Sequence, residues 1–139
     1  MNISIEYFLV TAAMSLLVSL VLAWLASFII YGKVTALKRI FPATHQLIRA
    51  HIDYLLMSIL LVVCFYLTER LDLRIPNSII LITCFGAVYN PFGFIVIAIK
   101  PELASPKTSL EKFRIMFGFL PATIGYGFIM IQVLRAYLL

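Results

Sequence analysis

The sequence has little charge: Asp, Glu, Lys and Arg make up 12% of its 139 residues, against about 25% in soluble globular domains. This scarcity excludes an ordinary soluble domain. A disordered chain is also excluded, because it requires low hydrophobicity and high net charge, whereas 63% of this chain is hydrophobic and its mean hydropathy is +1.07. The chain has room for about four membrane-spanning helices of roughly 20 residues each. We therefore predict an integral membrane protein in a lipid bilayer.

Cysteine and histidine are also scarce, with two of each. Cys64 and Cys84 lie inside apolar runs and form no CxxC or CxxCH motif, so a redox motif, a zinc site and covalently attached haem have no support. The net charge is +5, but no basic stripe alternates with exposed aromatic residues as single-strand binding requires. We therefore expect no nucleic-acid partner, and expect the cations to face anionic lipid headgroups.

Four apolar runs predict four transmembrane helices in one membrane domain spanning 1–139. A membrane β-barrel would instead show alternating segments of about ten residues. Short connections between helices place sequence neighbours side by side and antiparallel, so the expected fold is all-α, an antiparallel four-helix bundle. The predicted helices cover 7–31, 47–68, 78–99 and 113–138.

The distribution of Lys and Arg between the loops predicts the orientation in the membrane. Eight cations lie in or beside the first and third loops, and three lie on the opposite side. Cytoplasmic loops are enriched in Lys and Arg, so we expect both termini on the non-cytoplasmic side, in the inner membrane of a bacterium. The two groups are Lys33, Lys38, Arg39, Arg49, Lys100, Lys107, Lys112 and Arg114 against Arg70, Arg74 and Arg135.

Small residues recur at every fourth position of the first helix, which lets a neighbouring backbone approach closely. This pattern does not distinguish a partner in the same chain from one in another subunit. Pro91 and Pro121 interrupt the third and fourth helices, and each removes one backbone hydrogen bond. The stripe consists of Ser15, Ser19, Ala23 and Ser27.

His51 lies about one turn inside the second helix. A neutral imidazole there can ligate a metal or a haem iron, or it can simply bond to headgroups or to a backbone carbonyl. Tyr54 and Ser58, at i+3 and i+7, share its face. Asp53 points elsewhere, and its expected partner is Arg49 at i−4, because a carboxylate in the bilayer is costly unless it is paired or protonated.

Tyr89 and Asn90 occupy the middle of the third helix. An asparagine in hydrocarbon needs a partner, so we expect Asn90 to face the bundle interior or a cavity. It serves there either as a site residue or as an adhesive contact between helices. The estimated depths of His51 and Asn90 allow a small apolar molecule between a metal on His51 and the Tyr89–Asn90 pair.

Two short motifs carry a family resemblance. Residues 49–53, Arg-Ala-His-Ile-Asp, open the second helix, and residues 89–93, Tyr-Asn-Pro-Phe-Gly, lie in the third. This chain resembles the four-helix membrane isomerases typified by styrene oxide isomerase and hydroxylaminobenzene mutase. The family carries an asparagine six residues after the histidine, where this chain has Met57 followed by Ser58.

The resemblance implies a trimer with haem b between subunits, in which ferric iron acts as a Lewis acid on a substrate oxygen. His51 would then be the metal ligand, with Tyr54 beside the cofactor. Tyr89, Asn90 and Ser58 would be the catalytic residues that orient a small apolar substrate. The alternatives are a non-catalytic membrane protein, as complex subunit or carrier, and a haem electron carrier. For the last, His45 and His51 are poorly spaced to ligate one haem together.

Overall fold

The computed structural model describes residues 4–105 and 108–138. Every regular element in this part of the chain is helical. Four helices are long and apolar enough to cross a membrane, which confirms the predicted all-helical fold with four apolar spans. The elements are α1 (Tyr7–Ile30), α2 (Thr35–Ile40), α3 (Thr44–Arg70), α4 (Asn77–Ile99), the 3-10 helix η1 (Pro101–Ala104) and α5 (Ser109–Leu138).

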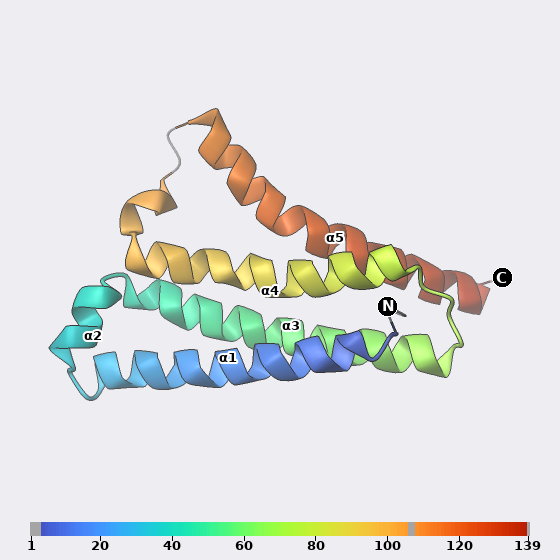
Figure 1. The fold of residues 1–139 in the computed structure, drawn as a ribbon, viewed down its shortest axis with the longest axis horizontal. Helices are drawn as coiled ribbons and strands as arrows, with labels where there is room; N and C mark the ends of the chain where they lie inside the picture. The colour runs from blue at the N-terminus through green and yellow to red at the C-terminus, as the bar shows by residue number, and fades with distance from the viewer. Residues whose placement is uncertain (1–3, 106–107, 139) are drawn as a thin grey trace.

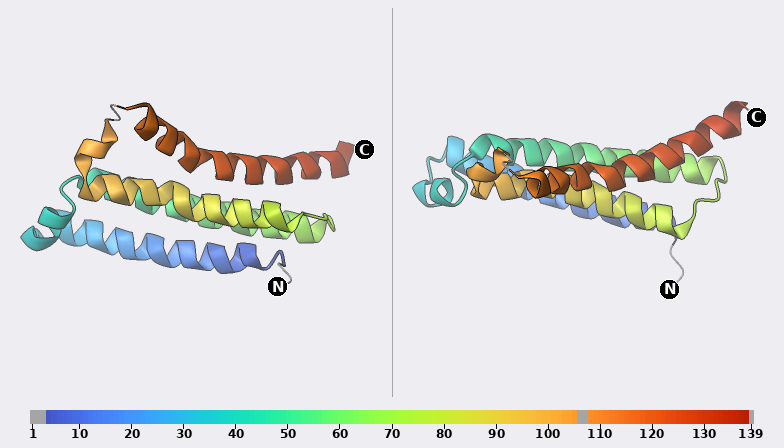
Figure 2. Two further views of the ribbon diagram at one scale, coloured as in Figure 1. Left: turned by 45° about the horizontal axis from the view of Figure 1, so that its top comes forward. Right: turned by 90° about the horizontal axis from the view of Figure 1, so that it is seen from above.

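The long helices form a stack with α3 and α4 in the middle (Figure 1). α1 packs mainly along α3, and α5 packs mainly along α4, so α1 and α5 lie on opposite sides of the central pair (Figure 2). The start of α1 and the end of α5 lie at the same end of the molecule as the α3–α4 connection, and α2 and η1 lie at the other end. Unlike a bundle of four equivalent helices, the first half of α5 splays away from α4.

The first predicted loop contains the short helix α2, which the hydropathy pattern did not indicate. The Lys38 ammonium donates to the Pro42 carbonyl at 2.8 Å and to Thr44 Oγ1 at 2.9 Å. The backbone N–H of Ala43 donates to the carbonyl of Ala98 at 3.2 Å. These bonds tie α2 and the end of α4 to the first turn of α3, which therefore begins at Thr44, before the predicted start at residue 47.

The small-residue stripe of α1 meets α3 of the same chain. Ser15 and Ser19 are buried between the two helices, with exposed fractions of 1% and 0%. Ser58 on α3 donates its hydroxyl hydrogen to the carbonyl of Ala12 at 2.9 Å. Because lipid is as apolar as the side chains, close packing and such hydrogen bonds are what hold transmembrane helices together. The stripe therefore serves, at least in part, the packing of α1 within the chain.

Two glycines let α4 and α5 touch at their backbones. A Cβ atom built on Gly86 would lie 2.7 Å from the Cα of Ala122, and one built on Gly125 would lie 2.7 Å from the Cα of Thr83. Real Cβ atoms do not approach backbone so closely, so no other residue fits without a shift. Between its start at Ser109 and Pro121, α5 diverges from α4 (Figure 1). The divergence opens a cleft between them.

Candidate functional site

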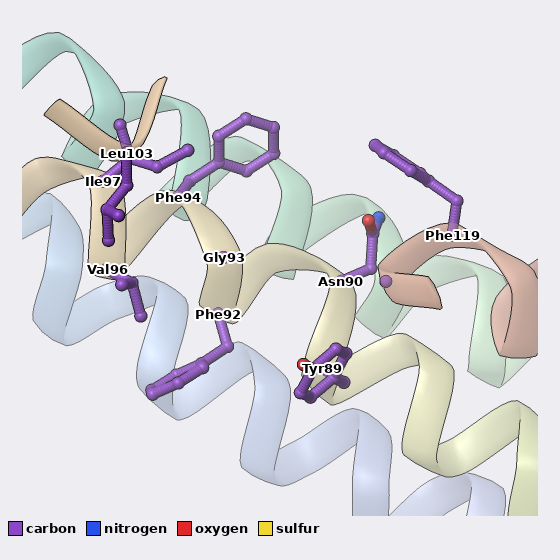
Figure 3. A pocket seen from close by; sticks show the side chains of 10 residues that line it. Tyr89, Asn90, Phe92, Gly93, Phe94, Val96, Ile97, Leu103 and Phe119 are labelled. Carbon is purple, nitrogen blue, oxygen red and sulfur yellow. The ribbon is translucent and has the colours of Figure 1, made fainter. Parts of the chain in front are cut away.

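A cavity of about 270 Å³ lies in the cleft between α4, η1 and α5 (Figure 3). Its walls are mostly apolar and rich in aromatic rings, with Asn90 as the one side-chain amide. Figure 3 shows Asn90 projecting from α4 on the side of Phe119 of α5. The lining residues are Tyr89, Asn90, Phe92, Gly93, Phe94, Val96, Ile97, Leu103, Gly118 and Phe119. An apolar pocket with a few polar groups is the usual form of a small-molecule site.

Tyr89 belongs to a row of aromatic rings along the seam between α4 and α5. Its ring stacks on Phe85 with centroids 5.1 Å apart and meets the edge of Phe117 at 6.5 Å. Phe113 extends the row at 6.3 Å from Phe117. Tyr89 is 36% exposed. The row braces α5 where it has left the backbone contact with α4, and so helps to keep the cleft open.

His51 is held by Ser19 of α1. Its Nδ1 lies 3.0 Å from the carbonyl oxygen of Ser19 and 2.8 Å from the Ser19 hydroxyl, which in turn lies 2.9 Å from the carbonyl oxygen of His51. Because the carbonyl of Ser19 can only accept, we assign the hydrogen to Nδ1 and let the hydroxyl donate to the His51 carbonyl. The hydrogen-bond network thus assigns the tautomer. In the neutral ring this tautomer places the lone pair on Nε2, which forms no hydrogen bond to any described residue.

Tyr54 and Ser58 are buried and use their hydroxyl hydrogens to join helices. Tyr54 donates to the carbonyl of Val88 on α4 at 3.0 Å, whereas Ser58 donates to α1. The Val88 carbonyl is next to the Ala87 carbonyl that Pro91 deprives of its usual donor. The predicted shared face of His51, Tyr54 and Ser58 therefore divides between two neighbouring helices, and none of the three lines the cavity.

The structure does not bring His51 together with Tyr89 and Asn90 in one chain. His51 faces α1, the cavity faces α5, and these helices lie on opposite sides of the central pair (Figure 2). The predicted position for a small molecule between His51 and the Tyr89–Asn90 pair is therefore not found within a single chain. The sequence could not reveal this, because helix adjacency was unknown.

The charges of Arg49 and Asp53 attract each other, as expected, but the two groups do not come within ion-pair distance. The Arg49 guanidinium lies over the ring of Phe94 on α4, 5.4 Å from the ring centroid, and no ion pair joins Arg49 to Asp53 in the described part of the chain. Phe94 also lines the cavity. The sequence did not reveal that Phe94 and Phe119 line the cavity, because the type of an apolar side chain does not indicate what the side chain faces.

Within residues 4–105 and 108–138, no three His, Cys, Asp or Glu side chains converge to hold a bare metal ion. A haem iron, in contrast, can be held by a single axial histidine. A haem site therefore does not require the cluster of ligands that a bare metal ion requires. Of the two histidines, His51 has its ring held by contacts with a neighbouring helix, and its Nε2 has no hydrogen bond to the described residues. His45 is exposed, and its Nε2 lies 3.1 Å from the side-chain nitrogen of Gln46.

Comparison with protein-family models, with curated proteins and with solved structures found no match to this chain.

Proposed function

We propose that the chain is a membrane-embedded isomerase of small lipophilic molecules, of epoxide or hydroxylamine type, that binds haem b through Nε2 of His51. The observation that carries the proposal is the bond from His51 Nδ1 to the carbonyl of Ser19. Histidines that ligate metals usually donate their other ring N–H in this way, which fixes the ring and raises its basicity. Ile48 and Leu55, at i−3 and i+4, give His51 apolar neighbours on its own face, which suits a porphyrin.

Each part of the chain has a distinct role in this proposal. Bound at His51, ferric haem would supply a Lewis acid for a substrate oxygen. Ser19 orients the imidazole. The aromatic walls of the cleft exclude water and hold the apolar body of the substrate, and the Asn90 amide and the Tyr89 hydroxyl supply hydrogen bonds that orient it.

The separation of His51 from the cleft bears on assembly. If both serve one reaction, His51 of one copy must meet the cleft of another, because α1 and α5 lie on opposite sides of each chain. The homotrimer implied by the family resemblance would allow such an arrangement. The proposal therefore requires an oligomer as the active form.

Haem binding is tested by titrating haemin into the purified, detergent-solubilised protein. We expect the wild type to give the Soret band of a histidine-ligated haem, shifted from that of haemin in detergent alone. This band should be lost in His51→Ala and restored by added imidazole, because imidazole can occupy the vacated space and ligate the iron. His45→Ala is the matched control and should keep the band. A wild type without a Soret band, or an unchanged band in His51→Ala, would contradict the proposal.

A second candidate is a non-catalytic lipophile carrier. It is favoured by the cavity having no contact with His51, since a carrier needs a binding site but no cofactor. The two candidates differ in their response to His51→Ala. A carrier would keep its lipophile binding and its transport in vesicles, whereas the isomerase would keep binding and lose turnover.

For orientation, we propose that both termini face away from the cytoplasm, in a bacterial inner membrane. Four of the cations that we expect on the cytoplasmic side lie at the end of the molecule that holds α2 and η1: Lys33, Lys38, Arg39 and Lys100. A fifth, Lys107, lies outside the described residues. Alkaline phosphatase fused after the last residue should be active, and a cytoplasmic fluorescent reporter fused there should be dark. The opposite result would reverse the orientation.

A further inference from the structure

We infer that Asp53 forms a polar edge of the α4–α5 cleft and makes it selective for lipophilic amines. The inference rests on one part of the proposed function, the use of the cleft as a lipophile site, and not on haem. It names the chemical class of the ligand, which the apolar lining alone does not.

The contacts between α3 and α4 fix the level of Asp53. These helices run in opposite directions (Figure 1), with Ala43 bonded to Ala98 and Tyr54 bonded to Val88. Between these two bonds, Arg49 lies over Phe94. Asp53 is one turn further along α3 than Arg49, and Asn90 is one turn back from Phe94 on α4, on the corresponding faces. Asp53 and Asn90 therefore lie level with each other.

The face of α3 that carries Asp53 is the face that α5 covers elsewhere. Cys64, about three turns further along and on nearly the same face, packs in one cluster with Ile129, and Tyr126 packs against that cluster; both residues belong to α5. The first half of α5 splays away from α4 (Figure 1), and the cavity that lies there is lined by Asn90 and Phe94 of α4. From its level and its face we infer that Asp53 borders the open part of the groove at the height of Asn90, just outside the residues that line the cavity itself.

The charge of Asp53 then decides what the cleft accepts. A carboxylate within an apolar span is costly without a partner. Among the described residues Asp53 forms no hydrogen bond and no ion pair, and the positive charge of Arg49 attracts it only from a longer distance. Arg49, the nearest candidate, is placed over Phe94 instead. A protonated amine would supply the missing partner, its other hydrogens could reach the Asn90 carbonyl oxygen, and the aromatic walls favour a cation by cation–π attraction.

The test compares a matched pair of probes by calorimetry on the purified full-length protein in detergent. The probes are 2-phenylethylamine and propylbenzene. The first carries an ammonium group at the position where the second carries a methyl group. We expect the wild type to bind the amine about tenfold or more tightly than the hydrocarbon, as a charge-assisted hydrogen bond allows. Asp53→Asn should lose this preference and keep propylbenzene binding, whereas Asp53→Glu should retain it.

Asp72→Asn is the matched control, because Asp72 is exposed in the turn after α3, and it should bind both probes as the wild type does. Equal affinity of the wild type for the two probes, or an unchanged preference in Asp53→Asn, would overturn the inference and leave the lipophile site standing. If neither probe binds, the cleft is not a lipophile site, and both the inference and that part of the proposed function are overturned. A wild type that forms no histidine-ligated Soret band with haemin would contradict the haem proposal alone.

Discussion

Gly86→Ala is expected to detach α5 from α4. The added Cβ would lie 2.7 Å from the Cα of Ala122 and 2.9 Å from the carbonyl carbon of Pro121, and these backbone atoms cannot rotate out of the way as a side chain can. Overpacking of a well-packed contact costs about 1–3 kcal/mol, occasionally more. Because α5 packs mainly against α4, we expect a loss of this size in the free energy of unfolding, measured by denaturant titration in mixed micelles.

Gly127→Ala is the matched control, since a Cβ on Gly127 of α5 meets nothing within 4 Å. It should leave stability unchanged or raise it by up to about 1 kcal/mol, because alanine is the better helix former. Equal stability of the two variants would show that the close contact between α4 and α5 does not hold the helices together.

Gly93→Leu is expected to weaken binding in the cleft strongly without unfolding the protein. Gly93 lines the cavity, yet a Cβ built on it meets nothing within 4 Å, so a larger side chain can be accommodated only in the open space of the cleft. Because a small ligand is mostly buried in its pocket, we expect the affinity for propylbenzene to fall by about tenfold or more, as measured by calorimetry.

Gly127→Leu is the control for Gly93→Leu, because it places the same side chain in open space away from the lining residues. It should bind propylbenzene as the wild type does. Both variants should keep the Soret band of the wild type, since neither glycine contacts His51. Unimpaired binding in Gly93→Leu would place the lipophile elsewhere.

The hydropathy pattern was sufficient to predict the four long helices. An apolar segment in a bilayer must satisfy its backbone hydrogen bonds within itself, and a helix does so locally. The helix ends were less predictable. α3 begins at Thr44 because Lys38 and Ala98 bond to the residues around its start, and these contacts join segments far apart in the sequence.

For the candidate site, too, the sequence predicted which residues matter but not which residues they contact. Residue type and spacing singled out His51, but the partner that fixes its tautomer, Ser19, lies on another helix. The i−4 rule paired Arg49 with Asp53, whereas the structure places Arg49 over Phe94, because an aromatic ring on a neighbouring helix can compete with a local carboxylate.

The sequence by itself determined that this chain is helical and apolar enough to cross a membrane four times, since both properties follow from local composition and backbone hydrogen bonding. Only the tertiary structure decided that α5 diverges from α4, that the resulting cleft includes Asn90, and that His51 faces the other side of the molecule. The physical reason is that lipid solvates every apolar face equally well. The choice of partners therefore depends on close contacts such as those of Gly86 and Gly125, which exist only after the helices have met.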